Sequence, residues 1–243
     1  EIRLSLVGSE MCIRDRTYTT DQMVFSSIGN FSVTTARDTA ARYLAERHTP
    51  TRSFQRAVPA VTPAFEKVLN KHTHQVHCIV GARAYDINDE RRVPLSLLVN
   101  ILGGPSANSL LNVLLREKNG LSYNIEASYS PYNDCGFVAI YFSSEHDNAD
   151  QCRELIARQI DLMRRETLSA RRLSMAKKQF LAQMAISMEN NESYMLGAGK
   201  SLLMHDDIDT LEEVYRKVAA VTAQQITDVA NEIFSTTSML MYK

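Results

Sequence analysis

Arg116 and Tyr123, seven residues apart, are the pair of side chains in this sequence with the clearest capacity for chemistry. A guanidinium and a phenol held side by side can both donate hydrogen bonds to a peptide carbonyl or a carboxylate. Gly120 lies between them and can adopt the left-handed conformation that ends a helix. A chain that turns there brings Tyr123 back alongside Arg116. The spacing alone also fits a surface arginine paired with Glu117 or Asp134, with the tyrosine lying on a sheet.

The elements that must position this pair follow from the residues before it. A helix is predicted over 106–118, because five apolar residues cover a broad arc at helical spacing: Leu110, Leu111, Val113, Leu114 and Leu115. Asn112 and Arg116 fall on the opposite side. No Lys-Ser/Thr follows the preceding Gly103-Gly104-Pro105, so it is no P-loop, and it lacks the G-x-G-x-x-G spacing of a dinucleotide-binding loop. We therefore expect a tight turn, in which glycine supplies unusual dihedral angles and Pro105 occupies the first helical turn.

The stretch from Ile101 through the diglycine to Leu111, continuing from Leu115 to Tyr123, resembles a known signature. It is similar to the second domain of the pitrilysin/insulinase-type zinc metallopeptidases, a family that also contains the mitochondrial processing peptidases. In that family the arginine and tyrosine at this spacing reach across a cleft to the substrate. The resemblance thus implies that Arg116 and Tyr123 bind substrate. The family's zinc motif, H-x-x-E-H, is absent from the sequence, so no catalytic residue is expected in this chain.

The predicted fold class is α+β. Strands are predicted over five segments: Phe65–Leu69, His74–Gly81, Ser122–Tyr129, Gly136–Ser143 and Ser238–Tyr242. Helices are predicted at 91–102 and 106–118 and over most of 149–234. Hairpin-linked strands with helices gathered into blocks favour an antiparallel-rich sheet covered on one face by helices. The family resemblance implies a metallohydrolase-like domain of the same kind.

Residues 1–16 need separate treatment. Ser5 to Arg16 resembles a translated sequencing adapter, and the chain begins at Glu1. We therefore expect a non-native leader and exclude it from fold prediction. The alternative is a native edge strand, since Ile2, Leu4 and Leu6 alternate with polar residues.

Three further segments complete the predicted domain organisation. Residues 17–47 are expected to form a strand, Met23–Gly29, and a helix, which the resemblance assigns to the tail of a missing catalytic domain. Residues 48–64 carry three prolines without periodicity and are predicted to be a linker. Residues 65–243 are expected to form the second, substrate-side domain, which is inactive by itself.

Histidine clusters are weak evidence for a metal site in this chain. His72, His74 and His77 fall within six residues, but on a strand the third points away from the first two. No cysteine or carboxylate lies within the cluster to complete a site. Glu145-His146 lacks the first histidine of the zinc motif and is predicted to be a surface turn. We expect no metal in this chain, and the resemblance places zinc in the full-length protein.

Composition limits the partners. A net charge of −1 provides no bulk basic field for nucleic acid. No apolar run approaches the ~20 residues needed to cross a bilayer, so no membrane association is expected. With Cys12 set aside, Cys78, Cys135 and Cys152 form an odd, scattered set. That pattern indicates a reducing compartment, and we expect a cytoplasmic location.

The predicted function is the substrate-binding half of a zinc-dependent endopeptidase that encloses and cleaves peptides. Its partners would be a peptide and a catalytic N-terminal half, supplied in cis or in trans. The alternative within the family is a non-catalytic partner subunit of a heteromeric peptidase. A third possibility is an unrelated α+β domain in which the 102–123 similarity is coincidence.

Overall fold

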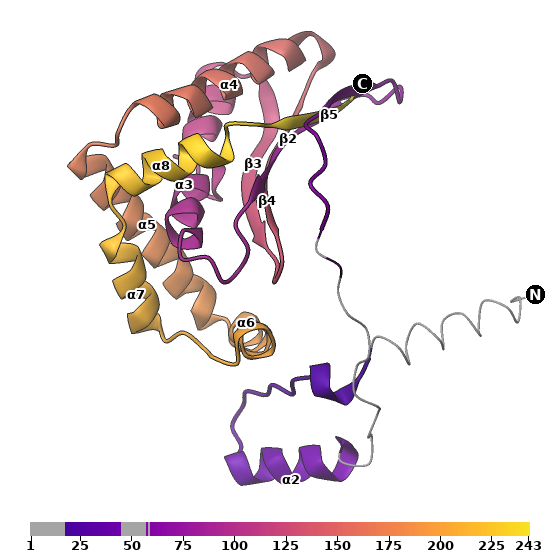
Figure 1. Cartoon of the computed structure of the whole chain (residues 1–243), viewed down its shortest axis with the longest axis vertical. Coiled ribbons are helices and arrows are strands. Elements are labelled where there is room, and N and C mark those ends of the chain that lie inside the picture. The colour runs from indigo at the N-terminus through magenta and orange to yellow at the C-terminus, as the bar shows by residue number, and fades with distance from the viewer. Residues whose placement is uncertain (1–17, 45–56, 58) are drawn as a thin grey trace, which may run out of the picture. The chain divides into compact units, whose positions relative to one another are not determined.

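The computed structural model describes residues 18–44, 57 and 59–243 (Figure 1). The predictions for residues 1–16 and for most of 48–64 lie outside the described residues. The chain divides into two compact units, of which the first comprises residues 1–57 and 184–211 and the second comprises 58–183 and 212–243. The grouping of 184–211 with the N-terminal segment was not predicted. The assignment of 17–47 and 65–243 to different domains stays a prediction.

A five-stranded sheet forms the centre of the second unit, in the order β1-β5-β2-β4-β3. Its strands are β1 (Glu66–Leu69), β2 (Val76–Ala84), β3 (Ser122–Pro131), β4 (Gly136–Ser144) and β5 (Ser238–Tyr242). Only β1 and β5 pair in parallel; the other neighbouring strands are antiparallel. The predicted antiparallel-rich α+β sheet is confirmed, with β3 at one end of it.

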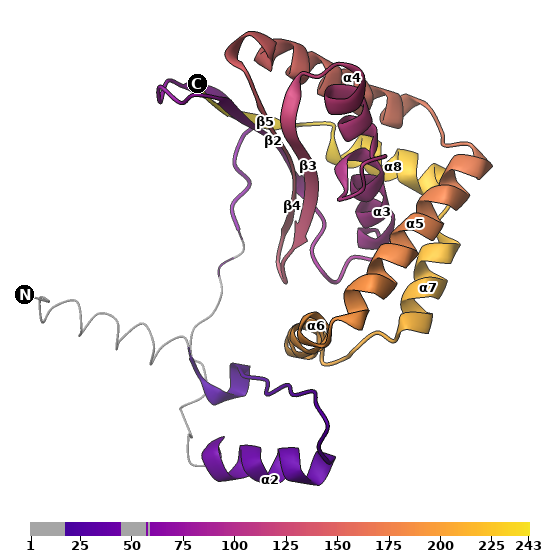
Figure 2. The same ribbon diagram turned by 180° about the vertical axis from the view of Figure 1, so that it is seen from behind.

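Helices α3 (Arg92–Gly103), α4 (Ala149–Arg165) and α8 (Ala223–Ile233) lie on the same side of this sheet (Figures 1 and 2). The apolar positions of the sheet face them, as alternation along a strand requires. Phe142 of β4 and Leu98 of α3 are fully buried in this core. On the opposite sheet face, Ile79 and Phe137 remain exposed. The predicted arrangement, with helices on one face, is confirmed within the second unit.

Three further helices are α5 (Ala170–Glu189), α6 (Asn191–His205) and α7 (Leu211–Ala220). A capping box begins α8: the Thr222 hydroxyl accepts from the Gln225 backbone N–H, and the Gln225 side chain accepts from the Thr222 backbone N–H. Among the described residues, no helix is long and apolar enough to span a bilayer.

The first unit contains η1 (Thr20–Gln22), α2 (Val33–Leu44) and α6. The helix predicted after residue 30 is confirmed as α2, but the strand predicted at Met23–Gly29 is wrong, because these residues form no strand. A strand needs a neighbouring strand for its backbone hydrogen bonds. Here the segment contacts a helix: the Ser26 hydroxyl donates to the carbonyl oxygen of Met195 in α6 at 2.9 Å.

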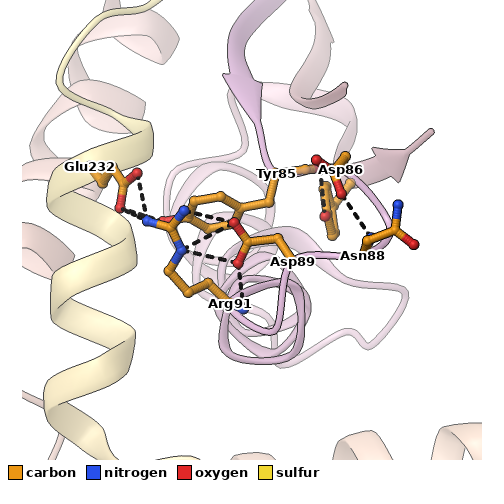
Figure 3. A network of polar contacts seen from close by, with 7 residues as sticks. Tyr85, Asp86, Asn88, Asp89, Arg91 and Glu232 are labelled. Atoms are coloured by element: carbon orange, nitrogen blue, oxygen red, sulfur yellow. Dashed lines mark hydrogen bonds and ion pairs between the residues drawn. The ribbon is translucent and has the colours of Figure 1, made fainter. Parts of the chain in front are cut away.

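A network of polar contacts joins the loop between β2 and α3 to Glu232 of α8 (Figure 3). The guanidinium of Arg91 lies 4.2 Å from the centre of the Tyr85 ring and bonds the carboxylates of Asp89 and Glu232. The Tyr85 hydroxyl also donates to Glu232 at 2.7 Å. Burial, together with this hydrogen bond, raises the pKa of Tyr85. The network sets the start of α3, whose other end leads into the candidate site.

Two of the three described cysteines are expected to resist thiol reagents in the folded chain. Cys78 and Cys152 are fully buried, whereas Cys135 is only half-buried. Burial raises the pKa of the Cys78 thiol from 9.0 to about 12, and a neutral thiol is a poor nucleophile. In a Cys12→Ser background, Ellman's reagent at pH 8 should label Cys135 first and the buried pair only after unfolding.

The same shift predicts a loss of stability in alkali. Between pH 9 and pH 12 the unfolded chain releases the Cys78 proton while the folded chain retains it. The contribution of Cys78 to the free energy of unfolding is therefore fully present below pH 9 and is lost as the pH rises towards 12. Equal thiol labelling of all three cysteines before unfolding would contradict the burial on which both expectations rest.

Candidate functional site

Gly103 and Gly104, at the end of α3, pack too closely against their neighbours to leave room for a side chain. A Cβ atom at Gly103 would lie 2.8 Å from the backbone nitrogen of Ala127 in β3, and one at Gly104 would lie 2.7 Å from the side-chain nitrogen of Asn100. Gly104 has φ −64° and ψ 176°, which any residue before proline adopts. The expectation of unusual dihedral angles at these glycines is thus wrong. Small size, which lets helix and strand approach, is the reason for them.

The helix predicted over 106–118 begins later than expected. Residues 104–109 form a turn, helical structure begins at Leu110, and η2 (Asn112–Lys118) is a π-helix. The turn is held by the Asn112 side chain, which donates to the carbonyl oxygen of Ala107 at 2.8 Å. A π-helix accommodates one extra residue per turn and is frequent at functional sites. Gly120 ends the segment with φ 61°, as predicted for a left-handed stop.

A β-bulge at the start of β3 sets the position of Tyr123. Ser122 pairs with Ser144 and Asn124 pairs with Ser143, so Tyr123 is the extra residue between them. The Ser122 hydroxyl is buried and bonds the carbonyl oxygens of Asn124 and Ser143, which closes the bulge. Bulges re-aim side chains beside active sites. In a regular strand Asn124 would point away from Tyr123; here both are exposed.

Arg116 and Tyr123 line the same cavity, of about 390 Å³. It lies between the turn after α3, the π-helix η2 and β3. Its remaining lining residues are Gly103–Ala107, Asn112 and Asn124–Ala127. The sequence placed Tyr123 beside the end of the helix that carries Arg116, and both residues line this cavity, whereas Asn124 was not among the predicted site residues. The extra residue at the bulge has no local sequence signal.

The two side chains present different hydrogen-bonding groups to this cavity. The guanidinium of Arg116 is largely exposed, and its contact with the Glu117 carboxylate is loose, at 4.0 Å. The Tyr123 hydroxyl donates to the carboxylate of Glu145 at 2.8 Å, and this bond raises the pKa of Tyr123. Its proton is thus committed to Glu145, while its oxygen can still accept. The cavity therefore offers donors at Arg116 and an acceptor at Tyr123.

The histidines of the second unit take separate positions. His72 has φ 51° and lies in the loop before β2, which begins at Val76 and not at the predicted His74. His77 on β2 bonds the hydroxyl of Tyr141 at 2.8 Å, and His146 bonds the carbonyl oxygen of Thr73. Among residues 18–44, 57 and 59–243, no three His, Cys, Asp or Glu side chains lie close enough together to hold a metal ion. The described residues do not fit a zinc ion.

Comparisons with known proteins identify the family of this chain. A family model described as the peptidase M16 inactive domain matches residues 13–180. An uncharacterized zinc protease of Bacillus subtilis is 28% identical over 221 residues, which cover 90% of this chain and 53% of that protein. The chain thus spans about half the length of this relative.

Solved structures show the same fold. A peptidase M16 inactive domain from Pseudomonas fluorescens superimposes with a TM-score of 0.76 at 19% identity, covering 88% of this chain and 52% of the other. A protease from Helicobacter pylori gives a TM-score of 0.76 at 14% identity, covering 89% and 54%. The family predicted from the segment between Ile101 and Tyr123 is confirmed. The chain belongs to the M16 peptidases, the pitrilysin/insulinase-type family, and carries the inactive domain of that family.

Proposed function

We propose that this chain is the substrate-binding half of a zinc-dependent endopeptidase, with Arg116 and Tyr123 as its peptide contacts. Relatives named as zinc proteases support the enzyme class. The observation that carries the proposal is the shared cavity of Arg116 and Tyr123 beside β3. Zinc and the hydrolytic water belong, in this proposal, to a separate catalytic half.

The position of β3 supports a peptide bound in extended form. This strand ends the sheet and pairs only with β4 among the described strands. The cavity follows β3 from Tyr123 to Ala127. An extended peptide can add to such an edge through main-chain hydrogen bonds, with side-chain pockets providing selectivity.

The two site residues complement a peptide backbone. A peptide group presents one acceptor and one donor, its carbonyl oxygen and its N–H group. Arg116 can donate to the carbonyl oxygen, and the Tyr123 oxygen can accept from the N–H while its proton stays on Glu145. Neither contact depends on the side chains of the peptide, which fits an enzyme that accepts many sequences.

An exposed apolar groove in the first unit is consistent with a catalytic partner, supplied in cis or in trans. Apolar side chains of α2 and of the segment before it line an open groove of about 560 Å³, among them Phe25, Val33, Ala36, Ala40 and Leu44. Val33 is 85% exposed, and no residue of α2 is buried. An amphipathic helix needs a surface to cover its apolar face. We propose that residues 17–47 belong to the catalytic half and pack against its sheet.

Peptide binding by this chain tests the proposal. A fluorescein-labelled unstructured peptide of about 20 residues should show saturable anisotropy with the wild-type chain. Arg116→Ala should weaken binding by about 5-fold or more, because the lost hydrogen bond contributes ~1 kcal/mol or more.

The matched control is Arg158→Ala, since Arg158 is also exposed on a helix of the second unit but lies outside the cavity. Its affinity should equal that of the wild type. Binding that is absent in the wild type, or equally weakened in both variants, would reject Arg116 as a peptide contact.

A further inference from the structure

Two glutamines of α5 hold the turn that forms one wall of the cavity. Asn100 in α3 donates from its side-chain nitrogen to Oε1 of Gln183 at 2.8 Å, and Nε2 of Gln183 donates to the hydroxyl of Ser106 at 2.6 Å. One helical turn earlier, Gln179 accepts from the side chain of Asn108 at 2.7 Å. Residues four apart lie on one helix face, so both glutamines face the same turn.

The contacts close a loop around the diglycine. The side-chain nitrogen of Asn100 lies beside Gly104, where a Cβ atom would approach it to 2.7 Å. From Asn100 the contacts continue through Gln183 to Ser106, and both Gly104 and Ser106 line the cavity. Gln183 therefore spans the turn from outside and leaves the cavity side free.

The other contacts of the turn are local, among them the bond from the Asn112 side chain to the carbonyl oxygen of Ala107. Its backbone bonds are short-range, with the Gly104 N–H donating to Asn100 and the Ser109 N–H donating to Ser106, each at 3.0 Å. Its small side chains from Gly104 to Ala107 provide little apolar packing, and Pro105 and Ala107 are exposed. The amide contacts from α5 are thus the long-range polar restraint on this wall.

We propose that Gln183 is a positioning residue of the peptide site: it fixes the 104–109 turn so that the cavity beside β3 is formed before the peptide arrives. This inference rests on the proposed peptide-binding function. A wall that is held in its bound conformation spares the ordering cost of binding. Gln183 itself is not a lining residue of the cavity, so it acts through Ser106 and Asn100.

Two substitutions separate this role from a general structural one. Gln183→Met keeps the length of the side chain but removes its hydrogen bonds. Gln183→Glu can still accept from the Asn100 amide and from the Ser106 hydroxyl, which rotates to donate. Labelled-peptide binding should weaken about 2- to 10-fold in the methionine variant and stay near wild type in the glutamate variant. The unfolding midpoint should be similar in both.

Hydrogen exchange gives a readout that does not need a peptide. The amides of residues 106–109 should exchange faster in Gln183→Met and at the wild-type rate in Gln183→Glu. Gln224→Met is the matched control, because Gln224 bonds Asp228 on the surface of α8. It should change neither binding nor exchange in the turn.

The outcomes are distinguishable. A wild-type chain that binds no peptide rejects the proposed function, and the hydrogen-exchange comparison then decides whether Gln183 fixes the turn. A wild-type chain that binds, together with a methionine variant of unchanged affinity and exchange, overturns the positioning role. Equal losses in the methionine and glutamate variants would also overturn it, since they would indicate a packing defect at position 183.

Discussion

In the complete protein, replacement of Arg116 by alanine is expected to lower kcat/KM for peptide hydrolysis by roughly 5- to 150-fold, because a charged hydrogen bond to substrate contributes ~1–3 kcal/mol. Tyr123→Phe should act in the same direction, since it removes the oxygen that accepts from the peptide. Thermal stability should change little. The Arg116 side chain is 60% exposed, and its ion pair with Glu117 is loose.

Steady-state kinetics on a fluorogenic peptide would measure both variants against Arg158→Ala and Tyr132→Phe, which lie outside the cavity. Losses confined to the Arg116 and Tyr123 variants would support direct contact with substrate. Wild-type kcat/KM in both variants would mean that the pair is structural.

Replacement of Gly136 by alanine is expected to be strongly destabilising, by ~1–3 kcal/mol or more, because overpacking at a rigid contact forces the backbone to move. A Cβ atom at Gly136 would overlap the carbonyl oxygen of Tyr85. That oxygen already accepts from the Tyr129 hydroxyl at 2.8 Å. The β2–β4 pairing and the Arg91 network resist the necessary shift.

Gly197→Ala provides a control of opposite sign. Gly197 lies in α6, and a Cβ atom there would meet nothing within 4 Å. Alanine should stabilise that helix by roughly 0.5–1 kcal/mol. Urea unfolding followed by circular dichroism would compare the two. A Gly136→Ala midpoint equal to wild type would show that β4 can move at its first residue.

Local sequence patterns were sufficient to predict much of the fold. The strands predicted at Gly136–Ser143 and Ser238–Tyr242 match β4 and β5 to within one residue, and Gly120 was correctly expected to take a left-handed conformation. The proximity of Arg116 and Tyr123 also followed from sequence, because a helix stop and an immediate strand return the chain to the helix end. These features depend on neighbours close in the chain, whose influence on conformation is strong.

Long-range interactions account for what sequence reasoning missed. Met23–Gly29 has apolar residues suited to a strand, yet it contacts α6 through Ser26 and Met195. Asn124 was left out because nothing in the Ser122–Asn124 segment marks a bulge. The restraint of Ser106 by Gln183 joins residues 77 positions apart, a pairing that no periodicity can indicate.

The π-helix and the β-bulge have a joint consequence for length variation along this part of the chain. Each holds one residue more than the regular element would, on either side of Gly120. Deleting a single residue would restore a regular helix or strand, but it would shift the phase of the side chains that follow. Tyr123 would then exchange faces with Ser122, whose side chain is buried. Substitutions should therefore be far better tolerated here than one-residue deletions, and relatives that keep the site should keep the interval of seven.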